Sequence, residues 1–197
     1  PQVMAEVLPP YGRFAAAVFL SIAAGKPIAF FRSHLGDGAA IVRAMPNTPA
    51  AVRRGITVCC PGAGVDAPRR ALCQSLLEAV GEVGWVEDES LMDAVTAVSG
   101  SGPAYVFLLA EVMAAAGIAQ GLPPELAARL ARATVSGAGE LLRQSSDSAE
   151  QLRKNVTSPG GTTAAALAVL MADGGGLPGL MDAAVAAAAR RGRELAG

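Results

Sequence analysis

The sequence predicts an α/β plus all-α fold, in which a partial and largely parallel sheet domain is followed by a helical domain. Up to about residue 88, short apolar runs alternate with helical patterns, which is typical of a mostly parallel sheet. From about residue 89 onward, every periodic segment has helical spacing. The chain has 197 residues and is 52% hydrophobic, which supplies ample material for a core. We therefore expect two domains, over residues 1–88 and 89–197.

The first domain is expected to contain four strands and two main helices. Short apolar runs predict strands at residues 18–23, 40–45, 55–60 and 84–87. A short helix is expected over 27–35, because Pro27 suits a first helical turn. An amphipathic helix is expected over 66–80, with Asp66 as its N-cap.

The second domain is expected to contain only helices, separated by segments rich in glycine and proline. Their predicted ranges are 91–99, 103–120, 124–143, 149–156, 163–171 and 180–195. Alanine-rich faces supply more small apolar positions than one small bundle can bury. Exposed apolar helix faces are usually interfaces, so we expect a face-packed or intertwined dimer.

Composition argues against several function classes. The 16 Lys and Arg residues nearly balance the 17 Asp and Glu residues, and only 4% of residues are aromatic, so nucleic-acid binding is not expected. Cys59, Cys60 and Cys73 lack metal-ligand spacing, and we interpret them as core residues of a protein from a reducing compartment. The single histidine, His34, is interpreted as a polar residue at a helix C-terminus rather than as a catalyst or metal ligand.

No membrane partner is expected either. The chain does not open with a signal peptide, and the apolar runs near Ala115 and Ala187 are interpreted as too short or too interrupted by charge to span a bilayer. A cytoplasmic location is therefore expected. The chain begins at Pro1, inside a helical pattern, so we expect further sequence upstream.

The segment from Asn155 to Thr163, Asn-Val-Thr-Ser-Pro-Gly-Gly-Thr-Thr, precedes an alanine-rich helix. The amides of a first helical turn lack carbonyl partners and lie at the positive end of the helix dipole, which suits an anion. Hydroxyls from Ser158, Thr162 and Thr163 surround that position. Two interpretations remain open from these residues alone: a plain hydroxyl N-cap, or a site for a small carboxylate or phosphate.

Two further segments are each weak signals alone. The sequence Ser-Gly-Ser-Gly-Pro at residues 99–103 breaks two apolar helices, and Thr96 lies one turn earlier. This break either faces a ligand or consists of a serine N-cap, with Thr96 bonding back to its own helix. The loop at residues 45–49 follows a strand directly, where α/β sheets hold ligands, but it is also readily explained as a rigid turn.

Together, the segments around Ser21–Gly25, residues 43–49, residues 93–105 and residues 158–163 resemble pyrroline-5-carboxylate reductase, in order along nearly the whole chain. The resemblance implies an oxidoreductase of proline biosynthesis that transfers hydride from NADPH or NADH to the C=N bond of 1-pyrroline-5-carboxylate, forming L-proline. It also implies an N-terminal Rossmann domain and a helical domain that interleaves into homodimers, which can assemble further.

The resemblance also implies roles for individual residues. Thr96 resembles the hydroxyl that lies against the ring nitrogen and orients or relays its proton, and Glu89 falls at a substrate-contacting position. Ala24 and Asn155 match positions near the cofactor. The substrate carboxylate would be held by the segment that starts the alanine-rich helix, namely Ser158, Gly160, Gly161, Thr162 and Thr163.

Three departures from the family pattern bear on activity. No glycine-rich G-x-G-x-x-G fingerprint is present, Pro1-Gln2 resembles a segment that normally follows the first half of the Rossmann domain, and Met171 replaces a usual acidic residue. We therefore expect little NAD(P)H-dependent activity from these residues alone. The alternatives are a non-catalytic dimerisation module that at most binds proline-like carboxylates, and a different imine or keto-acid reductase. The motifs at 99–103 and 158–163 argue against the latter.

Overall fold

The computed structural model describes residues 3–14 and 16–196, and the chain divides into two compact units. Unit 1 comprises Pro1–Pro103 and Val185–Gly197, and unit 2 comprises Ala104–Ala184. Pro1 and Gln2, whose family resemblance is noted above, lie outside the described residues.

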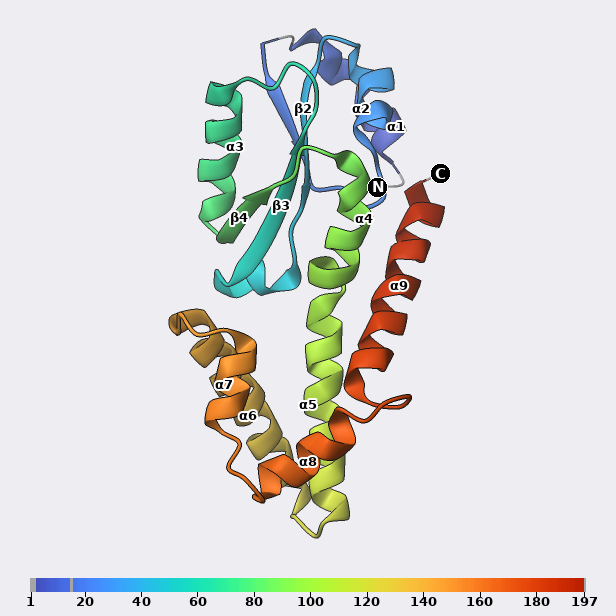
Figure 1. Cartoon of the computed structure of the whole chain (residues 1–197). Helices are drawn as coiled ribbons and strands as arrows, with labels where there is room; N and C mark the ends of the chain where they lie inside the picture. Colours follow the sequence, from blue (N-terminus) through green and yellow to red (C-terminus); the bar gives the residue numbers. More distant parts are fainter. Residues whose placement is uncertain (1–2, 15, 197) are drawn as a thin grey trace. The chain divides into compact units, whose positions relative to one another are not determined.

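Unit 1 is built on a four-stranded sheet in the order β1-β2-β3-β4 (Figure 1). The strands are β1 (Val18–Ser21), β2 (Ala40–Met45), β3 (Gly55–Pro61) and β4 (Gly81–Trp85). The β1–β2 and β3–β4 pairs are parallel, as expected, whereas β2 and β3 are antiparallel. The link between β2 and β3 holds only the short 3-10 turn η2 (Thr48–Val52), and a parallel crossover needs about a dozen residues or more. The sheet is therefore mixed but mostly parallel.

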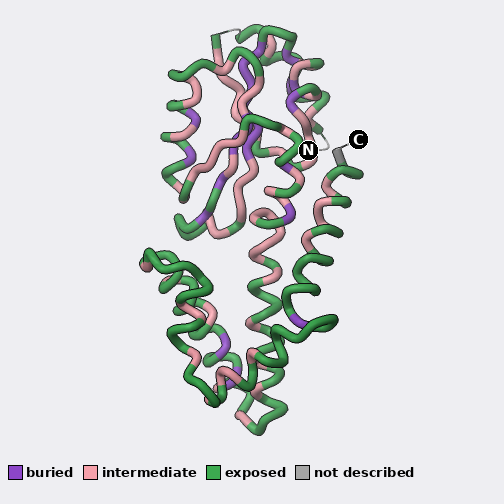
Figure 2. Tube along the Cα trace, viewed as in Figure 1, coloured by how far each residue is buried: buried purple, intermediate pink, exposed green. Residues whose placement is uncertain are grey.

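The two faces of the sheet pack separate cores, because successive strand residues point to opposite faces. On one face, Ile41 and Cys60 pack with α2 (Ile28–Leu35) and with Met92. On the other face, Val42 and Cys59 pack with α3 (Ala67–Glu78). Figures 1 and 2 show α2 and α3 on opposite sides of the sheet, with the buried residues concentrated along β2 and β3. The remaining N-terminal elements are α1 (Met4–Val7) and η1 (Pro9–Arg13).

The ends of the helices in unit 1 follow the expected capping chemistry. Asp66 accepts a hydrogen bond from the Arg69 amide at 3.0 Å and so caps α3. His34 lies in the last turn of α2, where its Nδ1 is 2.8 Å from the Phe30 carbonyl oxygen. Cys59, Cys60 and Cys73 are free and buried, which confirms their interpretation as core residues.

Strand β4 begins three residues earlier than the sequence predicts, because two glycines pair across it. Gly81 (φ +153°) lies opposite Gly55 in the β3–β4 register. A Cβ on Gly81 would overlap the Gly55 carbonyl, and one on Gly55 would approach the Ala50 backbone at 2.9 Å. Gly81 is therefore a close-approach residue within the strand and not the turn that glycine usually signals.

Four further elements complete unit 1. After η3 (Glu89–Leu91) come α4 (Met92–Val95) and a π-helical turn, η4 (Thr96–Gly100), where one regular helix was predicted over 91–99. The end of α9 (Leu177–Ala196) packs against α4 and against the loop after β1. A Cβ added to Gly192 would lie 3.2 Å from Asp93 Oδ1, and a Cβ added to Gly25 would lie 3.5 Å from the Leu195 carbonyl oxygen.

Unit 2 consists of helices, as predicted: α5 (Gly102–Ala119), α6 (Pro124–Gln144), α7 (Ala149–Asn155), α8 (Thr162–Leu170) and the first turns of α9. Its described residues bury little: Ala127 and Ala131 of α6 are buried, whereas α5 and α8 have no buried residue. Large apolar side chains on α5 are instead exposed, among them Val106, Phe107, Leu108, Leu109 and Val112.

The apolar run near Ala115 is longer than the sequence analysis allowed. Residues 89–119 form one helical stretch that is long and apolar enough, by length and composition, to cross a membrane, and its apolar window is not buried. The expectation that this run is too short was wrong, because α5 alone supplies 18 consecutive helical residues. Core helices of soluble proteins meet the same length and composition test. An apolar helix surface that its own unit does not bury is usually covered by another molecule.

Candidate functional site

The best-defined anion-binding feature in the described residues is the N-terminus of α8. Gly160 has φ +70° and turns the chain, and Gly161 is the N-cap residue, with no side-chain cap. The hydroxyl cap considered above is therefore not what the structure shows. The amides of Thr162 and Thr163 in the first turn are left for an external acceptor, since the first intrahelical bond runs from the Ala165 amide to the Gly161 carbonyl at 3.1 Å.

Hydroxyl groups border these amides. Ser158 and Thr162 are exposed, and Thr163 is half-buried. The Ser158 carbonyl accepts a hydrogen bond from the Gly161 amide at 3.1 Å. A Cβ on Gly161 would overlap the Ser158 Oγ, so glycine at this position lets that hydroxyl lie against the helix start. Uncapped amides, a positive helix end and nearby hydroxyls together form a small site suited to one carboxylate.

Asn155 ends α7, just before this loop. Its Oδ1 accepts a hydrogen bond from Gln151 Nε2 at 2.7 Å, within the same helix. Its side-chain nitrogen, Nδ2, makes no hydrogen bond to the described residues, so both N–H donors of this exposed side chain are available to a ligand.

In unit 1, Thr96 lies at the start of the π turn. Its hydroxyl donates to the Met92 carbonyl at 2.7 Å, and the Ser101 amide closes the turn onto the Thr96 carbonyl at 2.8 Å. A carbonyl can only accept, so the hydroxyl proton is directed toward Met92 and the oxygen lone pairs remain available. Both interpretations of Thr96 thus survive: it bonds back to its helix, and it can still accept from a ligand. Single π turns are frequent at functional sites.

The loop after β2 lies beside this turn. A Cβ on Gly100 would lie within 2.6 Å of Met45 Cε and 3.4 Å of Thr96 Cγ2, so Met45 contacts the turn that carries Thr96. Asn47 fixes the same loop by accepting from the Ile56 amide at 3.0 Å. The segment at residues 45–49 is therefore both a braced turn and a neighbour of the π turn that carries Thr96.

The carboxyl ends of the parallel strands β1 and β2 share one edge of the sheet, which is where open α/β sheets bind ligands. Exposed Ala24 and left-handed Gly25 (φ +71°) form the loop after β1 at this edge. Both residues are small, and the end of α9 packs against Gly25. A glycine-rich turn for the pyrophosphate is not among these 197 residues.

Glu89 is held by two partners in unit 1. Its Oε1 accepts from the Ile28 amide at 2.8 Å, which caps α2, and from the guanidinium of buried Arg43 at 2.9 Å. Its Oε2 makes no hydrogen bond to the described residues. Sequence reasoning missed Arg43 as the partner; the available signal was a lone cation inside the apolar run at 40–45.

The predicted site residues fall into two groups. Unit 1 carries Ala24, Glu89 and Thr96, and unit 2 carries Asn155 and the residues Ser158, Gly160, Gly161, Thr162 and Thr163. Within unit 2 the last five lie together at one helix end. Within unit 1, Glu89 lies on η3 and Thr96 on η4, with α4 between them, and Ala24 follows β1.

These features define an α/β protein with a helical unit, in which one helix N-terminus is suited to an anion and the apolar face of α5 is exposed. The family model for pyrroline-5-carboxylate reductase dimerisation matches residues 89–195. Pyrroline-5-carboxylate reductase from Pseudomonas aeruginosa is 45% identical over 179 residues, which cover 91% of this chain and 65% of that protein. The Synechocystis protein of the same name is 43% identical, with 99% and 72% covered.

Solved structures agree. A pyrroline-5-carboxylate reductase from Coxiella burnetii matches with a TM-score of 0.94 and 38% identity, covering 100% of this chain and 73% of that one. The Plasmodium falciparum pyrroline carboxylate reductase, solved with NADP bound, matches with a TM-score of 0.86 and 30% identity, covering 100% and 79%. The chain belongs to the pyrroline-5-carboxylate reductase family, and the predicted fold class is confirmed. It spans about two thirds of the length of curated relatives, 65% and 66% in two of them.

Proposed function

We propose that this chain is part of a reductase of proline biosynthesis that uses NADPH or NADH to convert 1-pyrroline-5-carboxylate to L-proline. The observation that carries the proposal is the uncapped N-terminus of α8, because its free amides supply donors for a small anion such as a carboxylate. Membership of the reductase family identifies which carboxylate is the best candidate.

In this proposal the substrate carboxylate accepts hydrogen bonds from the Thr162 and Thr163 amides and from nearby hydroxyls. Gly160 gives the turn its left-handed geometry, and Gly161 keeps the helix start open. Charge-assisted hydrogen bonds of this kind contribute about 1.5–3 kcal/mol each, enough to fix the orientation of a small ring.

A bound reduced nicotinamide would supply a hydride for the imine carbon, and a proton must reach the ring nitrogen. The loop containing Ala24 and Gly25 at the β1–β2 edge, and the free amide of Asn155, are the residues that we propose to lie near that cofactor. The proposal includes both NADPH and NADH as the hydride donor. The NADP bound in the Plasmodium falciparum structure supports a pyridine nucleotide.

Thr96 and Glu89 are proposed to act on the ring nitrogen. Because the Thr96 proton is directed toward the Met92 carbonyl, its oxygen can accept a hydrogen bond from the protonated nitrogen and so orient the iminium. Relaying a proton to the nitrogen would require the hydroxyl to rotate away from Met92. The Glu89 carboxylate, with Oε2 available, favours the cationic form of the substrate over the neutral imine.

We further propose that residues 1–88 belong to the Rossmann domain and residues 89–197 to the dimerisation domain, supported by the range of the family match. The working form is proposed to be a cytoplasmic homodimer or a larger homo-oligomer, without nucleic-acid or membrane partners. The name of the matching family model and the exposed apolar helices support self-association, and the free buried thiols support a reducing compartment.

A second candidate function is a non-catalytic dimerisation module that at most binds proline-like carboxylates. The exposed apolar helices of unit 2 are the observation in its favour. The reductase is preferred because the similarity to named reductases extends over nearly the whole chain and is not confined to residues 89–195.

Calorimetric titration with L-proline and an NAD(P)H oxidation assay with 1-pyrroline-5-carboxylate test both candidates together. Thr163→Ala should weaken proline binding about tenfold or more. Thr134→Ala, an exposed threonine on α6 of the same unit, should leave binding unchanged. Proline binding without oxidation supports the module, oxidation supports the reductase, and equal binding by both variants removes Thr163 from the site.

A further inference from the structure

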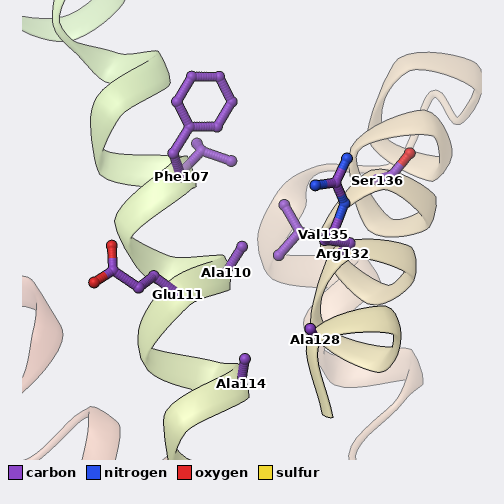
Figure 3. A pocket seen from close by; sticks show the side chains of 9 residues that line it. Phe107, Ala110, Glu111, Ala114, Ala128, Arg132, Val135 and Ser136 are labelled. Atoms are coloured by element: carbon purple, nitrogen blue, oxygen red, sulfur yellow. The ribbon is translucent and has the colours of Figure 1, made fainter. Parts of the chain in front are cut away.

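Two clefts in the described part of the chain differ in chemistry. The groove between α5 and α6, in unit 2, is lined mainly by apolar side chains such as Phe107 and Val135 (Figure 3). The cleft beside α2, in unit 1, has a volume of about 510 Å³ and mixes apolar residues with charged ones. We call it the α2 cleft. Its walls are α2, the end of β3 and the segment that leads into η3, and they bring Arg32, Asp37 and Glu89 into one cavity.

Arg32 is held in the α2 cleft but still has free donors. Its Nη2 donates to the Ala63 carbonyl at 3.0 Å, and its Nε is buried without a hydrogen-bond partner among the described residues. Its Nη1 forms neither a hydrogen bond nor an ion pair with these residues. Buried polar groups in native proteins nearly always have a partner. Gly62 keeps room for the guanidinium, since a Cβ there would lie 3.5 Å from Nη2 and 3.1 Å from Ile28 Cγ2.

Carboxylate oxygens without partners line the same cleft. Oε2 of Glu89 makes no hydrogen bond to the described residues, because the Ile28 amide and Arg43 both use Oε1. Asp37, just after α2, is exposed and forms no ion pair within the part of the chain that the structure describes. Arg32 pairs with neither acid. The α2 cleft therefore holds a cation and separate carboxylates that do not neutralise one another.

We propose that the α2 cleft binds a small α-amino acid as a zwitterion, with its carboxylate on Arg32 and its ammonium group on Glu89 Oε2 or Asp37. A guanidinium and a carboxylate form charge-assisted hydrogen bonds. A plain anion would meet the two acids and a plain cation would meet the arginine, so like charges disfavour both. The apolar part of the lining, from Ile28 and Pro61, suits a short aliphatic side chain.

This site is separate from the carboxylate site at the start of α8, which lies in unit 2. The inference goes beyond the proposed reductase, and only its consequence for turnover rests on that function. Oε2 of Glu89 is also the oxygen that we propose to face the ring nitrogen of the substrate. An amino acid bound in the α2 cleft would compete for this oxygen and so inhibit the reaction.

Titration with L-valine, followed in proton–nitrogen NMR spectra, tests the proposal. The Thr163→Ala chain is used, so that the α8 site contributes little, and neither substrate nor cofactor is present. The Arg32 Nε–H signal and the Ile28 amide signal should shift together and saturate. Isovalerate, which lacks the ammonium group, and isobutylamine, which lacks the carboxylate, should each bind about tenfold or more weakly than valine.

Two variants with matched controls locate the site. Arg32→Gln should weaken valine binding about tenfold or more, with the Ile28 amide as the signal, whereas Arg54→Gln, at an exposed arginine of unit 1 outside the cleft, should bind normally. Ala29→Phe fills the cleft from an exposed position of α2 without changing its charge, and it should abolish binding. The control Ala71→Phe adds the same side chain at an exposed position of α3 and should bind like the parent chain. Ala29→Phe decides the matter if Arg32→Gln does not fold.

Several outcomes would overturn the proposal. Valine that causes no saturable shift at Arg32 shows that the cleft is not an amino-acid site. Isovalerate that binds as well as valine shows a plain anion site, and isobutylamine that does so shows a plain cation site. Unchanged affinity in Ala29→Phe places valine elsewhere. Because the α8 site and the cofactor take no part, these results are independent of whether the chain reduces 1-pyrroline-5-carboxylate.

Discussion

Replacing Glu89 with alanine should destabilise unit 1 well beyond the usual effect of a surface mutation. One carboxylate oxygen of Glu89 accepts both the Ile28 amide at 2.8 Å and the Arg43 guanidinium at 2.9 Å. The side chain of Arg43 is 9% exposed and that of Glu89 is 29% exposed. The change therefore removes a helix cap and leaves a nearly buried cation without its partner.

The expected loss follows from these two contributions. Removing an N-cap acceptor costs about 1 kcal/mol. Breaking a buried ion pair by removing one partner costs about 3–5 kcal/mol, and the partial exposure of Glu89 reduces this because water can reach its side of the pair. We expect Glu89→Ala to lower the free energy of unfolding by about 2–4 kcal/mol in total.

Urea unfolding at pH 7 and fixed protein concentration measures the loss, and hydrogen exchange of the Ile28 amide localises it. Glu87→Ala is the matched control, because Glu87 lies two residues away and its ion pair with Arg70 is solvent-exposed, with 73% of the Glu87 side chain accessible. That variant should lose less than about 1 kcal/mol and leave Ile28 protected.

A second variant separates the cap from the charge. Glu89→Gln keeps an oxygen that can accept from Ile28 but removes the negative charge beside Arg43, so Ile28 exchange should stay slow while stability still falls. If Glu89→Ala costs no more than Glu87→Ala, or leaves Ile28 exchange unchanged, then Glu89 does not hold α2 and Arg43 in the way the structure shows.

Three further predictions concern the reaction, the anion site and the thiols. Thr96→Val should lower kcat about tenfold or more, with a smaller effect on KM. The control Ser99→Ala removes a similar hydroxyl-to-carbonyl hydrogen bond in the same π turn and should change neither kcat nor KM. Equal effects of the two variants would mean that only the integrity of the turn matters. Gly161→Ala should weaken L-proline binding without unfolding α8. The φ of −78° at this position suits alanine, but the new Cβ would displace the Ser158 hydroxyl. Calorimetry measures the affinity for L-proline, and an unchanged affinity would contradict the proposed site. Burial raises the pKa of Cys59 from 9.0 to about 12, so the unfolded thiol ionises first and the free energy of unfolding should fall between about pH 9 and 12. The slope from this thiol is about 1.4 kcal/mol per pH unit, and denaturation at several pH values should show it diminished in Cys59→Ala.

Much of unit 1 was predictable because its strands are short apolar runs between strong turn signals. β2 was predicted at its observed bounds, and β3 differs by a single terminal residue. The start of β4 was predicted three residues too late. Gly81 is needed for the close approach of β4 to β3, and a local sequence pattern does not show such a long-range requirement. The antiparallel β2–β3 pair was available from the sequence, since residues 46–54 are too few for a crossover.

The candidate site was predictable in composition but not in geometry. The Gly160-Gly161 pair indicated an open helix start, yet only the backbone shows that the N-cap is Gly161 and not a hydroxyl residue. The π turn at Thr96 was missed because helical spacing alone does not distinguish it from regular helix. Arg43 was visible as a lone cation in an apolar run, but its partner could not be identified because Glu89 lies far along the chain.

The bare apolar surface of α5 has a thermodynamic consequence for the cell. In the proposed homodimer, a helix with no buried residue in its own chain gains most of its hydrophobic stabilisation when the partner covers it, so folding and subunit association become one reaction. The stability of such a chain has no single value, because each tenfold rise in subunit concentration adds about 1.4 kcal/mol per dimer. Synthesis rate and dilution then set how much of this protein survives proteolysis, and a poorly expressed variant can fail without any defect in its site.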